Sequence, residues 1–151
     1  MAASAFIVYS KNKDRISQLD MTSATVNLVA LTSTYTPDAS VTGHSIYANL
    51  TNELTTSGGY TLGGVNLPTP IKTSIAGGWK FSTNQASWTA SGAGIPAHRY
   101  YAMYLVGTVW GLVNPLIGYF IGDATPADIP LTTSGNPLTV TASANGWFDI
   151  T

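Results

Sequence analysis

The acidic side chains are the first candidates for chemistry, because two carboxylates held about 5 to 9.5 Å apart can hydrolyse a glycosidic bond. The seven acids are scattered along the chain, mainly in expected turns and near the termini: Asp14, Asp20, Asp38, Glu53, Asp123, Asp128 and Asp149. Asp123 and Asp128 could face each other across a loop and bind calcium, but they lack the dense oxygen-ligand spacing of a known calcium-binding loop. The sequence therefore identifies no catalytic carboxylate pair and no metal site.

The other residue types that could do chemistry form no motif either. His44 and His98 are the only histidines, and neither has metal-ligand spacing around it. A serine nucleophile would need a base and an orienting acid that converge in space, and the G-x-S-x-G elbow is absent. The glycine pairs of SGGYTLGGVNL lack the Lys-Ser/Thr of a phosphate-binding loop, so they are better interpreted as turns. We expect no enzymatic activity and no cofactor.

The composition narrows the function classes further. Charged residues make up only 9% of the chain, against about 25% in a typical soluble domain, so the surface must be largely neutral and poorly protected against association. The net charge of −1 offers no basic surface to nucleic acid. Cysteine is absent, which excludes disulfides and thiolate metal sites. The N-terminus lacks a positive leader before its short apolar run, so we expect no secretory signal.

The longest uncharged stretch follows Arg99 and ends at Gly122: RYYAMYLVGTVWGLVNPLIGYFIG. It has the length of a membrane-spanning helix, about 20 residues, but its glycines and Pro115 oppose a helix. Aromatic and branched residues at both ends favour strands, whereas GTVWGLVNP between them contains turn signals. We predict two buried strands joined by an apolar loop, and no membrane helix.

Further strands are expected in TVNLVALT, GWKFST, ASWTA, PLTVTAS and WFDIT. Gly, Pro, Asn and Ser separate them at short intervals, as in sandwiches and barrels. Helical patterns, which an α/β fold would need between its strands, are missing after residue 20. We predict a mainly all-β fold: a β-sandwich or jelly-roll-like domain over residues 21–151, preceded by an N-terminal helical or extended segment over residues 1–20.

Two apolar groups of residues are candidates for contact with a partner. The first is the apolar loop, where Trp110 is accompanied by Val109, Leu112 and Val113. A tip this apolar is not expected to face water alone, so it either contacts a partner or folds back over its own core. The second group lies at helical spacing between residues 5 and 19, where a strand through FIVY is the alternative to a short helix: Phe6, Tyr9, Ile16 and Leu19.

Three patterns occur together over nearly the whole chain. They are L-T-S-x-Y-T-P-D at residues 31–38, E-x-x-x-x-G-x-Y-T-x-G-G-x-x-L at residues 53–67, and Trp88 followed by Arg99-Tyr100 and then Pro115-Leu116-Ile117. In this combination the chain resembles the small structural proteins of tailed-bacteriophage virions, which are associated with the head as decoration or cement proteins. The chain departs from the family where LVGTVWGLVN replaces a short polar turn, and where Leu19-Asp20 replaces a glycine near the end of the first helix.

The resemblance implies a non-enzymatic β-rich protein that decorates the capsid shell and cements it by bridging capsomers. The implied partner is the major capsid protein, with a homo-oligomer, a trimer as the first expectation, on the capsid surface after assembly in the host cytoplasm. Neither nucleic acid nor a membrane is implied. Two alternatives stay open: a neck, tail or fibre component of the virion, and a carbohydrate-binding β-sandwich module that stacks sugars on Trp or Tyr.

Overall fold

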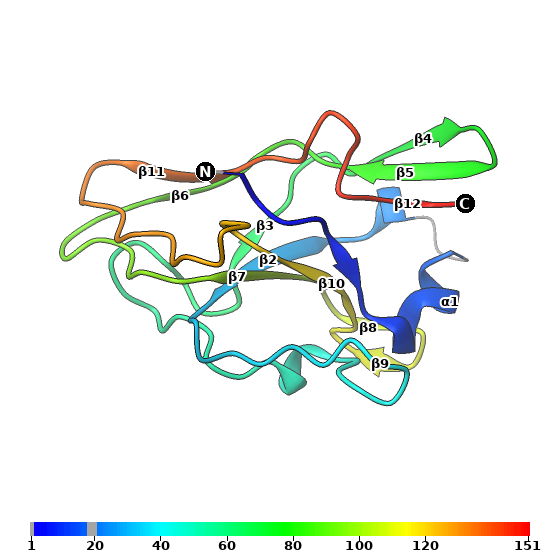
Figure 1. Cartoon of the computed structure of the whole chain (residues 1–151), viewed down its shortest axis with the longest axis horizontal. Helices are drawn as coiled ribbons and strands as arrows, with labels where there is room; N and C mark the ends of the chain where they lie inside the picture. The colour runs from blue at the N-terminus through cyan, green and yellow to red at the C-terminus, as the bar shows by residue number, and fades with distance from the viewer. Residues whose placement is uncertain (1, 18–20) are drawn as a thin grey trace.

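The computed structural model describes residues 2–17 and 21–151. Its central layer is a five-stranded antiparallel sheet (Figure 1). The strands in order across this sheet are β1 (Ile7–Val8), β10 (Leu116–Ile121), β7 (Tyr100–Leu105), β2 (Val26–Leu31) and β3 (Val65–Asn66). β7 pairs with β10 on one side and with β2 on the other. The two strands predicted at the ends of residues 99–122 are therefore confirmed, and they are neighbours at the centre of the sheet.

A second layer covers one face of the central sheet. It contains β5 (Gly78–Ser82) between β4 (Ile71–Ile75) and β12 (Phe148–Ile150), and β6 (Ala86–Thr89) paired with β11 (Pro137–Val140). β6 follows β5 along the chain, and β12 follows β11. The β5–β12 pair and the β6–β11 pair therefore form one kinked layer, which is interrupted at residues 83–85 and 141–147. The predicted all-β fold is confirmed, and β5, β6, β11 and β12 coincide with predicted strands.

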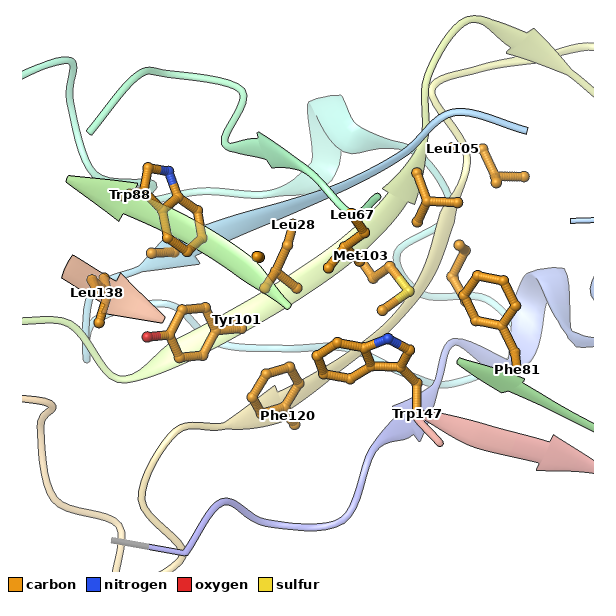
Figure 2. Close-up of a cluster of buried hydrophobic side chains, with 14 of the residues drawn as sticks. Leu28, Leu67, Phe81, Trp88, Tyr101, Met103, Leu105, Phe120, Leu138 and Trp147 are labelled. Atoms are coloured by element: carbon orange, nitrogen blue, oxygen red, sulfur yellow. The ribbon is translucent and has the colours of Figure 1, made fainter. Parts of the chain in front are cut away.

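The main core lies between these two layers, and its buried residues form what we call the larger core cluster. Figure 2 shows side chains from both layers in contact across it: Leu28, Tyr101, Met103, Leu105 and Phe120 from the central sheet, and Phe81, Trp88, Leu138 and Trp147 from the second layer. Successive side chains of a strand point to opposite faces. In β7, Met103 therefore joins the larger cluster while Ala102 and Tyr104 join a smaller cluster on the opposite face.

The opposite face of the central sheet is covered by residues 32–64, which we call the covering segment. Apart from isolated bridges, its one regular element is the 3-10 turn η3 (Tyr47–Asn49). Tyr35, Tyr47 and Leu50 of this segment pack against the smaller cluster, and Figure 1 shows the segment below the sheet, in cyan to green. The central sheet is consequently buried on both faces, which explains why β2 and β7 are apolar at nearly every position.

The N-terminal segment joins the sandwich as an edge strand. β1 pairs with β10, and the chain then turns through η1 (Ser10–Asn12) into the short helix α1 (Lys13–Ile16); η2 (Met21–Ser23) precedes β2. The prediction of a short helix is thus confirmed, but the strand alternative holds for Ile7–Val8. Gly118 permits the edge pairing, since a Cβ there would lie 2.5 Å from the Ile7 carbonyl oxygen. Within the described residues, no helix is long and apolar enough to cross a membrane.

Candidate functional site

The acids considered for metal binding have separate roles. The Asp123 carboxylate accepts hydrogen bonds from the amide and hydroxyl of Thr125, at 3.0 and 2.8 Å, and these bonds lower the pKa of Asp123. Asp128 instead forms an ion pair with Arg99 at 2.8 Å. Across residues 2–17 and 21–151, no group of three or more His, Asp or Glu side chains could hold a metal ion.

His98 is a core residue with both ring nitrogens in use. It is fully buried, with Nδ1 3.0 Å from the Pro96 carbonyl oxygen and Nε2 2.7 Å from the Tyr101 hydroxyl. A neutral ring satisfies both contacts if Nδ1–H donates to Pro96 and the Tyr101 hydroxyl donates to Nε2. Burial lowers the pKa of His98, which favours this neutral form.

Glu53, the acid of the second sequence pattern, joins three parts of the covering segment, and Tyr60 links this cluster to the sheet. Its Oε1 accepts hydrogen bonds at 2.7 Å from both the Tyr60 hydroxyl and the Gly63 amide, and its Oε2 accepts one from the Tyr47 hydroxyl. The Tyr60 hydroxyl in turn accepts a bond from the Ala30 amide of β2 at 3.1 Å. Burial, followed by the Glu53 charge, raises the pKa of Tyr60. Sequence reasoning treated Glu53 as a scattered acid, although its seven-residue spacing from Tyr60 within the pattern was the available signal.

A second clamp uses the tyrosine of the first sequence pattern. The hydroxyls of Tyr35 and Tyr9 lie 2.6 Å apart, and the Tyr35 hydroxyl lies 3.0 Å from Nδ1 of His44. Burial raises the pKa of Tyr35 to about 12 and raises that of Tyr9 more strongly. The contact ties the start of the covering segment to the N-terminal edge of the sheet. Two of the three patterns that carry the sequence resemblance therefore supply structural hydrogen bonds.

The apolar loop between β7 and β10 folds as a small hairpin, which we call the tip hairpin (residues 106–115). β8 (Thr108–Val109) pairs with β9 (Leu112–Val113) around the two-residue turn Trp110-Gly111. Both turn residues have positive φ, 55° and 74°, as a type I′ turn requires. At the base, the Asn114 amide donates to the Gly107 carbonyl at 2.7 Å, and the Gly107 amide donates to the Asn114 side chain at 2.7 Å. The predicted loop is therefore an ordered hairpin.

Trp110 occupies a backbone position that suits Asn or Gly. A bulky residue at positive φ is uncommon, and such a conformation costs about 1 to 3 kcal/mol. The Trp110 ring offsets this cost by packing, half-buried, against the larger core cluster, as does Val109. The tip was expected either to contact a partner or to fold back over the core. Trp110 and Val109 fold back over the core, although part of each side chain stays exposed.

The exposed apolar side chains of the tip hairpin are those of two valines. Val113 is 63% exposed and Val106, at the end of β7, is 42% exposed, while Leu112 is half-buried. Sequence reasoning included Val113 but missed Val106, because nothing in the uninterrupted apolar run shows where β7 leaves the core. The hairpin is held in place at its base, where the Tyr47 amide donates to the Asn114 carbonyl at 2.8 Å.

The N-terminal candidates do not form a free surface. Tyr9 and Ile16 are both 0% exposed, in the smaller and larger clusters respectively, so the expectation that they contact a partner is corrected. They are buried because β1 and α1 fold back onto the edge of the central sheet. Phe6 is half-buried and stacks on Phe148, with 5.3 Å between ring centroids. Leu19 lies outside the described residues.

Comparison with known proteins adds no family to this description. No family model matches the chain, and no significant match is found among the curated proteins or the solved structures compared with it.

Proposed function

We propose that the chain is a non-enzymatic virion structural protein that decorates the shell of a tailed bacteriophage and cements it by bridging capsomers. The proposal rests on the sequence resemblance and on one structural observation, the apolar surface of the tip hairpin. Its partner is the major capsid protein, its place is the capsid surface, and it acts as a homo-oligomer, with a trimer as the first expectation from the resemblance.

The tip hairpin supports this proposal because it carries exposed apolar side chains on an element that a backbone hydrogen bond holds at its base. Val106 and Val113 are exposed, and the half-buried ring of Trp110 in the same hairpin keeps part of its surface. Burial of apolar surface against a partner contributes about 25 cal/mol per Å², and aromatic residues at such positions often dominate binding energy. The low charge of the chain adds little electrostatic repulsion to association.

A cement protein acts through complementary surface. If each copy buries area on two neighbouring capsomers, then separating these capsomers also exposes the buried area. Binding to the assembled shell, and not to dissociated subunits, stabilises the shell by mass action. No residue needs to perform a chemical step.

The test is to add the purified chain to particles of the same phage that lack it. We expect the chain to sediment with heads in a copy number set by the capsid lattice, and to raise the temperature at which heads release DNA. Sedimentation only with isolated tails would place it in the neck, tail or fibre. Sedimentation with neither fraction would contradict a virion role.

A further inference from the structure

β4 forms one edge of the second layer and leaves part of its backbone without a partner strand. It pairs only with β5, in a hairpin that closes at the Ile75–Gly78 pair around a two-residue turn. Figure 1 shows this hairpin, in green, at the upper right. Opposed residues of an antiparallel pair alternate between exchanging hydrogen bonds and exchanging none, so every second residue of β4, counted back from Ile75, bonds to β5. The N–H and C=O groups of Lys72 and Ser74 therefore point away from β5.

These outward backbone groups are open to a partner. Within the described residues, Lys72 and Ser74 make no backbone hydrogen bond outside the β4–β5 pairing. The turn η2 lies near β4, but residues 71–74 are all exposed. A strand edge with unpaired N–H and C=O groups can add a strand from another chain.

β4 also lacks the features that protect most strand edges. Such edges are commonly very short, or are interrupted by bulges, proline or charge. β1 and β3 have two residues each, and β11 begins with Pro137. In contrast, β4 has five residues, pairs with β5 without a register shift and carries one charge, that of Lys72. The Lys72 ammonium lies 4.8 Å from the ring centre of Trp79 in β5, which holds this charge away from the open edge.

The sequence of β4 is complementary to itself in one antiparallel register. When Lys72 of each copy lies opposite Ser74 of the other, both pairs exchange N–H···O bonds and all the outward groups of these residues are used. Thr73 then lies opposite Thr73 of the second copy, a favourable cross-strand pair. Ile71, which is 42% exposed, lies opposite Ile75 of the second copy, so the contact removes apolar surface from water. The two lysines are not opposed.

We propose that β4 pairs with β4 of a second copy in this register, which joins the three-stranded sheets of the two copies into one continuous layer across a two-fold axis. The proposal goes beyond attachment to a capsid and does not use the tip hairpin, which belongs to the central sheet. It gives the free chain a dimer, where the sequence resemblance implies a trimer. Dimerisation can fail while attachment to heads holds, and the reverse.

The test is sedimentation equilibrium of the whole chain at up to roughly 1 mM, which reaches millimolar affinities. We expect a reversible dimer for the wild type. Thr73→Lys and Thr73→Glu each place like charges opposite one another, and each should weaken dimerisation at least about tenfold. An equimolar mixture of these two variants should dimerise again, because opposite charges then meet. Thr139→Lys is the matched control: Thr139 is exposed on the other edge of the same layer, so this variant should dimerise like the wild type.

Single-cysteine variants give an independent measurement, because the chain contains no cysteine. Opposed residues that exchange no hydrogen bond have Cα atoms about 4.5 Å apart, which lies within the range of a disulfide. In oxidised glutathione, Thr73→Cys should therefore form a covalent dimer much faster than Thr139→Cys.

The proposal is overturned if the wild type stays monomeric, if its association is unchanged in Thr73→Lys, if the mixed variants do not dimerise again, or if both cysteine variants cross-link equally. A wild-type trimer that Thr73→Lys leaves intact would support the resemblance and contradict the edge pairing. Thr73 lies opposite Lys80 of β5, so a slightly lower melting temperature is expected for Thr73→Lys but not for Thr73→Glu. Loss of the dimer in both variants therefore separates loss of association from loss of folding.

Discussion

At the scale of single residues, Gly64 shows why the glycine pairs of the second sequence pattern are needed. Its φ is 75°, and a Cβ at this position would fall on the carbonyl oxygen of Leu28 in β2. The glycine thus allows the covering segment to approach the sheet closely before β3 begins. Gly77, in the β4–β5 turn, has a similar φ of 80° but open space around it, which makes it a matched comparison.

We expect Gly64→Ala to lower the free energy of unfolding far more than Gly77→Ala. Positive φ alone costs an alanine about 1 kcal/mol, and this is the whole cost at Gly77. At Gly64 the clash with backbone adds strain that only movement of the segment can relieve, so we expect a loss of at least about 3 kcal/mol. Denaturant unfolding of both variants measures the difference, and equal losses would show that the close approach is not required.

His98 makes stability depend on pH in a defined direction. Burial lowers the pKa of His98 in the folded chain, whereas in the unfolded chain it keeps its ordinary value of about 6.5. Near that pH the unfolded chain therefore binds more protons than the folded chain. The free energy of unfolding therefore falls as pH falls through this range and levels off below the folded pKa. Unfolding measured at several pH values should show this slope in the wild type but a reduced slope in His98→Gln. A slope unchanged in His98→Gln would contradict this assignment.

At the scale of elements, the covering segment has little regular secondary structure, and side-chain clamps add to the few backbone hydrogen bonds that join it to the sheet, such as that from the Leu54 amide to the Ala30 carbonyl at 3.0 Å. Glu53→Gln removes the negative charge that accepts three hydrogen bonds, from Tyr47, Tyr60 and Gly63. We expect it to lower the free energy of unfolding by about 2 kcal/mol, since bonds to charged groups contribute about 1.5 to 3 kcal/mol. Exposed Asp149→Asn, which loses no internal bond, is the control. Amide exchange should accelerate first in the covering segment, and a uniform increase over the central sheet would contradict a local clamp.

Within the tip hairpin, some residues stabilise the fold and others are exposed and free to bind a partner. Trp110→Ala removes a ring packed against the larger core cluster, so we expect it to lower the free energy of unfolding by about 1 to 3 kcal/mol, less than for a fully buried Trp. Val113→Ala should change it by no more than about 0.5 kcal/mol. Thermal and denaturant unfolding of the isolated variants measure both values. Unchanged stability in Trp110→Ala would mean that the ring does not pack on the core in solution.

The elements that could be predicted from the sequence are those with a strong local pattern. β7 and β10 were predicted because aromatic and branched residues fill them and glycines bound them. β4 was missed because four of its five residues are exposed, so it has no apolar alternation. β8 and β9 have two residues each and were hidden in one apolar run.

The clamps could not be predicted, because they join residues that are distant along the chain. Tyr9 and Tyr35 are 26 residues apart, and their contact exists only once β1 has paired with β10 at the edge of the sheet. Likewise, the burial of Tyr9 and Ile16 follows from that pairing. Spacing alone fits an apolar helical face and cannot distinguish a face that packs on the core from one that binds a partner.

At the scale of the whole molecule, the exposed apolar residues of the tip hairpin lie in the connection between two central strands of the sheet. The tip hairpin connects β7 with β10, and the covering segment fixes its base through the bond from the Tyr47 amide to the Asn114 carbonyl. The sparse charge of the chain fits a protein whose contacts are made by apolar and hydroxyl groups.

The most direct test of the proposed role is the occupancy of Val113→Asp on heads that lack the wild-type chain, compared with Leu131→Asp. Leu131 is 49% exposed and lies between β10 and β11, outside the tip hairpin. An unpaired carboxylate is costly to bury, so Val113→Asp should lower affinity for heads at least about tenfold, the loss expected from one buried valine. Both variants should melt like the wild type, and Leu131→Asp should keep full occupancy. Full occupancy of Val113→Asp would contradict attachment through the tip hairpin.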